Sequence, residues 1–220
     1  MTLGDLTPSA DFVSSAVSFM TPGGATPRVS FGNKQVAARY VYWADADDTD
    51  AGVAGWYLED DDDATVCQNS VNIPFATGFL VYRTGSEADA TISSAGAVST
   101  EPVTKSFPNA QYNICGNCSP TAITLGDITV NDKFVSSAIS FMTPGGATPR
   151  VTFGNKQVAA RYVYWSDADD TDAGEIGWYL EDDDDATVCQ NDVKLEAGQG
   201  FLVYRTGSES EATLTIPSAL

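Results

Sequence analysis

Apolar and polar residues alternate with a period of two along most of this chain, which predicts β-strands. In QVAARYVYW at 35–43, Val36, Ala38, Tyr40 and Tyr42 fall on one face, and the odd-numbered residues fall on the other. Turn signals such as TPGG, GN, DTDAG and TGSE recur about every eight to twelve residues. No segment combines a helical period with capping residues, so we expect an all-β protein.

The chain repeats itself almost letter for letter at an offset of 122 positions, without insertion or deletion. GWYLEDDDDATVCQN stands at 55–69 and again at 177–191, and GFLVYRTGSE stands at 78–87 and again at 200–209. A self-similarity of this kind marks a repeated structural unit. Because loops and acidic runs match as well as apolar positions, either the duplication is recent or both copies present the same surface to one kind of partner.

Each repeat has room for about seven short strands in roughly 95 residues, which is typical of a β-sandwich or small barrel. We therefore expect two tandem, nearly identical β-sandwich domains, immunoglobulin-like or jelly-roll-like, at 1–97 and 125–220. A cysteine-containing connector at 98–124 precedes the second repeat only. This asymmetry suggests that a neighbouring molecule adds a strand to an open edge of the first domain.

The stretch LEAGQGFLVYRTGSESEATLTI at 195–216 resembles the closing segment of tandem β-sandwich repeat modules in large secreted bacterial surface proteins. In those modules a "pGqGF.vyr.gs" stretch ends each β-domain. The likeness covers the last quarter of each repeat, and the first repeat departs from it with IPFATGFLVYRTGSEADATI. It implies an extracellular β-repeat and no catalytic activity.

Charge and composition narrow the function further. Thirty acidic residues face 11 basic ones, a net charge of −19, which argues against nucleic acid and anionic membranes as partners. No apolar run is long enough to cross a bilayer, so we expect no membrane insertion. The chain has no histidine, so it lacks the usual general base and every triad that needs one. We therefore predict that the protein is not an enzyme.

Four cysteines are present, namely Cys67, Cys115, Cys118 and Cys189. We expect two structural disulfides, with Cys118 paired to Cys189 and Cys115 paired to Cys67, each closing a loop worth about 3–4 kcal/mol. Such bonds imply an oxidising, extracellular compartment. A zinc site built from all four thiolates and bonds between different chains are the alternatives.

Two acidic runs in each repeat raise the question of calcium, the one cofactor that the sequence suggests. Calcium prefers oxygen ligands, and Asp-rich loops supply them, although the spacing here does not match an EF-hand. The competing interpretation is a solvated charge run that keeps the protein soluble. The residues that would bind calcium are Asp45, Asp47, Asp48 and Asp50 with Asp167, Asp169, Asp170 and Asp172.

Tryptophans flank these acidic runs and allow a second functional hypothesis. Aromatic faces beside aspartate and calcium would suit a calcium-dependent module that binds carbohydrate or a surface ligand, whereas tryptophan in a sandwich usually packs in the core. The residues concerned are Trp43, Trp56, Trp165 and Trp178. This adhesin-like hypothesis, with glycans as partners, is the alternative to our main expectation.

Our main expectation is a structural, non-catalytic protein at the cell surface or outside the cell. Near-identical surfaces at a fixed offset suit a head-to-tail homopolymer, because contacts that do not close on themselves produce filaments. We expect the chain to assemble with itself into a fibre, a filament or a surface layer.

Overall fold

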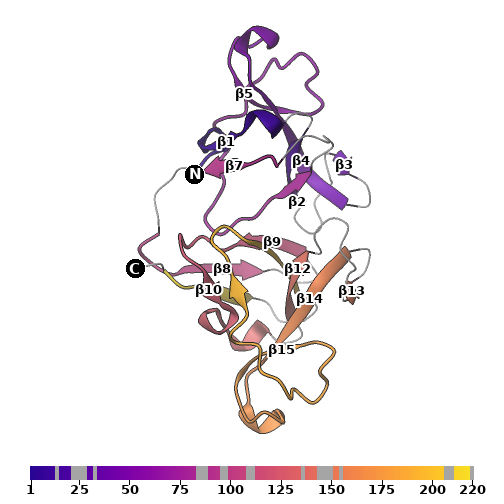
Figure 1. Cartoon of the computed structure of the whole chain (residues 1–220), viewed down its shortest axis with the longest axis vertical. Helices are drawn as coiled ribbons and strands as arrows, with labels where there is room; N and C mark the ends of the chain where they lie inside the picture. Colours follow the sequence, from indigo (N-terminus) through magenta and orange to yellow (C-terminus); the bar gives the residue numbers. More distant parts are fainter. Residues whose placement is uncertain are drawn as a thin grey trace. The chain divides into compact units, whose positions relative to one another are not determined.

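A computed structural model gives the fold of this chain, which separates into two compact units, unit 1 (Met1–Ala97) and unit 2 (Val98–Leu220) (Figure 1). Its helical segments are 3-10 turns of three residues, and its sheets are antiparallel, so the prediction of an all-β protein is confirmed. Within the described residues, no helix is long and apolar enough to cross a membrane. The structure describes residues 1–12, 15–20, 29–31, 34–82, 89–94, 99–107, 112–134, 137–142, 151–153, 156–205 and 211–218.

Unit 1 contains two antiparallel sheets in its described residues. The larger has five strands, in the order β3-β4-β2-β6 with β5 also paired to β4, and the smaller pairs β1 with β7. The strands are β1 (Leu6–Pro8), β2 (Ala16–Met20), β3 (Val29–Phe31), β4 (Lys34–Trp43), β5 (Gly55–Leu58), β6 (Leu80–Tyr82) and β7 (Ile92–Ser94).

Unit 2 contains the corresponding strands and four more, of which β8, β9 and β10 come from the residues predicted to be a connector and β16 comes from the second repeat. Its largest sheet has the order β13-β14-β12-β17-β9, with β15 also paired to β14, and two smaller sheets have the orders β11-β18-β8 and β10-β16. The strands are β8 (Val103–Phe107), β9 (Tyr112–Gly116), β10 (Ile123–Thr124), β11 (Thr129–Val130), β12 (Ser137–Met142), β13 (Val151–Phe153), β14 (Lys156–Trp165), β15 (Gly177–Leu180), β16 (Lys194–Leu195), β17 (Gly200–Arg205) and β18 (Ala212–Ile216).

Strand registers in the two units agree at the offset of the sequence repeat. In the β2–β4 pair Ala16 stands opposite Val41, and in the β12–β14 pair Ala138 stands opposite Val163. Both pairs shift register at the same place, before the methionine that ends β2 or β12. Identical alternation therefore produces identical pairing, because a slip of one residue would turn the buried face outward.

The core of unit 1 is built around Trp56, which is fully buried. Its ring makes edge-to-face contacts with Phe12 at 5.9 Å and with Tyr42 at 5.2 Å between ring centroids. Its indole Nε1–H donates to the Leu6 carbonyl at 3.1 Å. Because the buried N–H of Trp56 is hydrogen-bonded, the side chain stabilises the core without the cost of an unpaired polar group.

Asn69 fastens the loop after the acidic run onto this core. Its Oδ1 accepts from the Trp56 amide at 3.0 Å, and its Nδ2 donates to the Ala54 carbonyl at 3.4 Å. The side chain lies where a Cβ on Gly55 would be, since that atom would approach it to 2.5 Å. Glycine at this position therefore gives the asparagine room to reach the strand backbone.

We predict that Asn69→Ala destabilises unit 1 by about 1–3 kcal/mol, because the change leaves partly buried backbone groups without their partners. Urea unfolding followed by tryptophan fluorescence measures the loss. Gln68→Ala in the same loop is the control, and we expect it to change stability by less than about 0.5 kcal/mol. Equal effects of the two variants would contradict the role assigned to Asn69.

Candidate functional site

The two units differ at one sheet edge, and this edge is the candidate functional site. In unit 2, β9 pairs with β17 and β8 pairs with β18, so connector strands extend both sheets. The corresponding strands of unit 1, β6 and β7, each have one neighbour among the described residues, β2 and β1 respectively. Both sheets of unit 1 thus end one strand earlier than their counterparts in unit 2.

The missing strands leave apolar core residues exposed in unit 1. Val81 lies opposite Val17 in the β2–β6 pair, and Val17 is fully buried in the core, so both residues belong to the core face. The side chain of Val81 is nevertheless 50% exposed. Its counterpart in unit 2, Val203, is 0% exposed and lies between Ile139 on β12 and Asn113 on β9.

The same contrast runs along the whole edge strand. Phe79 and Leu80 are only partly buried in unit 1, whereas Phe201 and Leu202 are buried in unit 2. These stretches have identical sequences. The difference in burial therefore arises from the surroundings of the strand and not from its composition.

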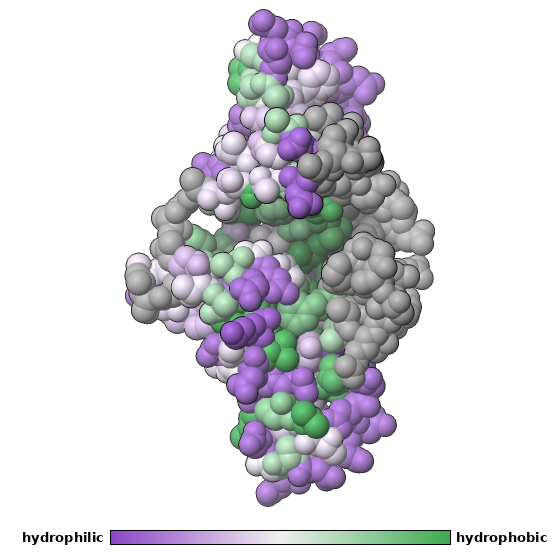
Figure 2. Space-filling view, in the orientation of Figure 1, coloured by the Kyte–Doolittle hydropathy of each residue, from purple (hydrophilic) through white to green (hydrophobic). Residues whose placement is uncertain are grey.

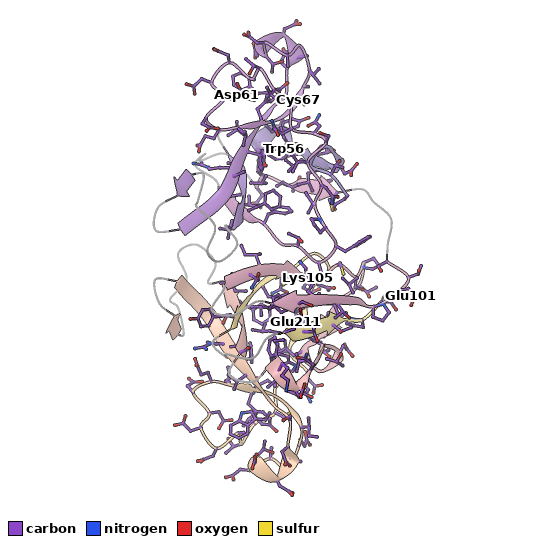
Figure 3. The ribbon with its side chains drawn as sticks, turned by 180° about the vertical axis from the view of Figure 1, so that it is seen from behind. Trp56, Asp61, Cys67, Glu101, Lys105 and Glu211 are labelled. Atoms are coloured by element: carbon purple, nitrogen blue, oxygen red, sulfur yellow. The ribbon has the colours of Figure 1, made fainter. Side chains whose placement is uncertain are left out.

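Connector residues complete the core of unit 2. Phe107 at the end of β8 is 2% exposed, and Cys115 on β9 is fully buried opposite Phe201. Lys105, labelled in Figure 3, lies opposite Leu214 on β18, and partial burial lowers the pKa of its ammonium group. Sequence reasoning singled out the cysteines here but missed the alternation VTKSF at 103–107, whose period of two signals a strand.

Asn117 anchors the connector to unit 2 and was also missed from the sequence. Its side chain is 2% exposed. Its Nδ2 donates to the carbonyls of Thr121, Leu195 and Glu196 at 3.0–3.1 Å, and its Oδ1 accepts from the Ser119 amide. A buried amide with these partners fixes the chain direction after β9.

No two cysteines are at disulfide-bonding distance in this structure, so the predicted disulfide framework is not present. Cys118 and Cys189 both belong to unit 2 and are not bonded. The thiol of Cys115 is enclosed in the core, where burial raises its pKa to about 12 and keeps it protonated. Cys67 instead lies beside the hydroxyl of Tyr57, in the loop that follows the acidic run (Figure 3).

The acidic runs shape the loops through specific hydrogen bonds. The carboxylate of Asp45 accepts from the Asp47 amide at 3.0 Å and begins a 3-10 turn (Ala46–Asp48). Asp61, labelled in Figure 3, accepts from the amides of Val66 and Thr65 at 3.0 Å, and from the Thr65 hydroxyl at 2.9 Å. Asp183 makes the same three bonds in unit 2. These hydrogen bonds lower the pKa of both carboxyl groups.

The remaining aspartates are arranged as a solvated surface. The side chains named as candidate calcium ligands are all exposed, and the tip of unit 1 beyond β5 is largely hydrophilic (Figure 2). Among the described residues, no three acidic or cysteine side chains are grouped as a metal site would require. Calcium binding by these residues remains an untested prediction without support from the geometry.

The tryptophans divide into two pairs. Trp56 and Trp178 are 0% exposed and cannot stack on an external ligand. Trp43 and Trp165 are partly buried at the ends of β4 and β14, and Trp165 makes an edge-to-face contact with Tyr179. The adhesin-like alternative therefore loses half of its proposed aromatic residues to the core.

Ion pairs of arginine support the same strands. Arg39 on β4 forms an ion pair with Glu59 at 2.6 Å, and the Glu59 amide donates to the Arg39 carbonyl at 2.9 Å. Arg161 pairs with Glu181 in the same way in unit 2. The first residue of each EDDDD run is thus tied to a strand.

Comparison with known proteins gives no relative: the chain matches no protein-family model, no curated protein and no solved structure. The likeness to surface-protein repeat modules accordingly stays a prediction from sequence, and the functional argument depends on the structure.

The capping aspartates predict a defined response to acid. Because their folded pKa lies below the ordinary value of 3.8, their stabilisation is present above about pH 3.8 and is lost as the pH falls through the folded pKa. The double variant Asp61→Ala, Asp183→Ala should be less stable than the native chain at neutral pH. Near pH 2 the stabilities of the two proteins should differ little. Urea midpoints at both pH values measure this difference.

The control is Asp62→Ala with Asp184→Ala, which removes the same charge one residue along each run. We expect this control to keep the full stability at neutral pH. If both double variants lost equal stability, the turn hydrogen bonds would not be the source of the effect.

Proposed function

We propose that this chain is a structural, non-catalytic extracellular protein that assembles head to tail into a fibre, filament or surface layer through two tandem β-sandwich domains. The observation that supports this proposal is the contrast between the two units at one edge. Unit 2 carries connector strands there, whereas unit 1 exposes a core valine at the same position.

An open edge of this kind is an assembly surface for a physical reason. It presents unpaired backbone N–H and C=O groups together with apolar side chains, and both are satisfied when another strand is added. Among the described residues this edge is open in unit 1 and paired in unit 2, so the contact that it makes is heterologous. Heterologous contacts that do not close into a ring extend into filaments.

Other parts of the chain support a structural role. Trp56 and Trp178 are used in the cores, and Asp61 and Asp183 are used in capping turns. The edge of β6 presents an exposed apolar side chain that none of these roles uses. The extracellular location rests on the likeness to secreted repeat modules and on the high negative charge, because no disulfide is present to support it.

We expect negative-stain electron microscopy of the native protein to show filaments or sheets with a regular repeat. Val81→Asp should leave the protein dispersed, because a carboxylate on the core face would have to be buried on strand addition. Val66→Asp is the matched control, since Val66 is 59% exposed in unit 1 and lies on a loop away from the edge. We expect this control to assemble like the native chain.

Dispersed native particles at all concentrations would contradict the proposal. If Val81→Asp assembled as well as the native chain, the edge would not be the assembly surface. Sedimentation velocity gives the same comparison in solution, without adsorption to a grid.

A further inference from the structure

The structure of unit 2 shows what kind of partner fits the open edge of unit 1, and this step rests on the proposed function. We infer that the edge formed by β6 and β7 takes up a two-strand segment of another molecule, with the chemistry of residues 103–116. The segment pairs in the register that β8 and β9 use on unit 2.

The acceptor strands of the two units have closely related sequences. Residues 78–87 are identical to residues 200–209, and ATIS at 90–93 corresponds to ATLT at 212–215. A segment that fits β17 and β18 therefore meets the same backbone and nearly the same side chains on β6 and β7. The second sheet shows the same difference in burial. Ile92 on β7 is only partly buried, whereas its counterpart Leu214 on β18 is 0% exposed.

The register follows from the pairing in unit 2. There Cys115 stands opposite Phe201 and Asn113 stands opposite Val203. Transferred by the offset of the repeat, the incoming residue 113 lies opposite Val81. The same transfer places Cys115 opposite Phe79, where an apolar contact forms.

Charge also favours this segment over a second copy of the open edge. Residues 1–97 contain 13 acidic residues and four basic ones, whereas residues 103–116 contain Lys105 and no acidic residue. A segment of this composition is attracted to unit 1. Two copies of unit 1 meeting edge to edge would bring two acidic surfaces together, and such like-charge contacts are unfavourable.

The copy of this segment at 103–116 is already held by unit 2 of the same chain. Each chain has two acceptor edges but one donor segment at 103–116, and unit 2 holds that segment through two strand pairs and through Asn117. The occupant of the unit 1 edge is therefore a connector-type segment of another molecule.

The outer edge of unit 2 is finished differently. In β8, Thr104 and Ser106 are exposed and Lys105 stands between them, so the terminal strand is polar and carries a charge. Natural edge strands use such residues to prevent further pairing. Unit 1 lacks this protection at Val81, which distinguishes an acceptor edge from a terminated one.

The test uses the full chain and a synthetic peptide of residues 103–116, kept reduced, with titration followed by fluorescence anisotropy. We expect saturable binding with one peptide per chain. Val81→Asp should weaken binding at least about tenfold, because a charge is buried in the contact. Val66→Asp should leave binding unchanged, and a scrambled peptide should not bind.

A cross-link then reports the register. Val81→Cys in the chain, combined with Asn113→Cys and Cys115→Ser in the peptide, should form a disulfide that mass spectrometry maps to position 81. Ile114→Cys with Cys115→Ser in the peptide should not, because residue 114 lies on the other face of the strand. This arm does not depend on whether Val81→Asp folds.

Absence of saturable binding overturns the inference, and so does binding that is insensitive to Val81→Asp or a cross-link with the wrong register. A dimer of the chain that forms at this edge and ignores the peptide also overturns it. If filaments form but the peptide neither binds nor blocks them, the inference fails and the proposed function stands. If the peptide binds at position 81 while the chain never assembles, the inference stands and the proposed function fails.

Discussion

The pairing of β9 with β17 is the interaction on which the difference between the two halves depends. Where it is present, Val203 is enclosed, and the core is closed by Phe107 and Cys115. Where its counterpart is missing, the same strand sequence leaves Val81 half exposed. A sheet tolerates an open edge in isolation, but the free energy gained by adding a strand is then available to a partner.

Hydrogen bonds in the loops stabilise the rest of each unit. Asn69 ties a loop to the strand that carries Trp56, and Asp61 closes the acidic turn through three hydrogen bonds. These features recur in unit 2 with the same partners, so they serve the fold of each unit. The acidic run that first suggests a metal site is in part a set of turn caps, surrounded by carboxylates exposed to water.

The alternation of apolar residues was enough to predict β4 and the all-β class, because one buried face fixes both the strand and its register. Sequence could not predict the state of the cysteines, since Cys115 is buried by strands far along the chain. It also did not reveal the roles of Asn69 and Asn117, whose hydrogen bonds join segments distant in sequence. The repeat also hid the candidate site from sequence reasoning. Residues 78–87 and 200–209 are identical, but β17 has a neighbour in β9 and β6 has no described counterpart of it.

Amide hydrogen exchange measured by NMR on the native chain tests the central claim most directly. The two edge strands have the same sequence, so their unprotected exchange rates are equal and any difference reports structure alone. In dilute protein without a partner, the account predicts that at least one amide among Leu80, Val81 and Tyr82 exchanges far faster than its equivalent among Leu202, Val203 and Tyr204. Equal protection of the two strands under those conditions would contradict it, because β6 would then already be paired on both sides.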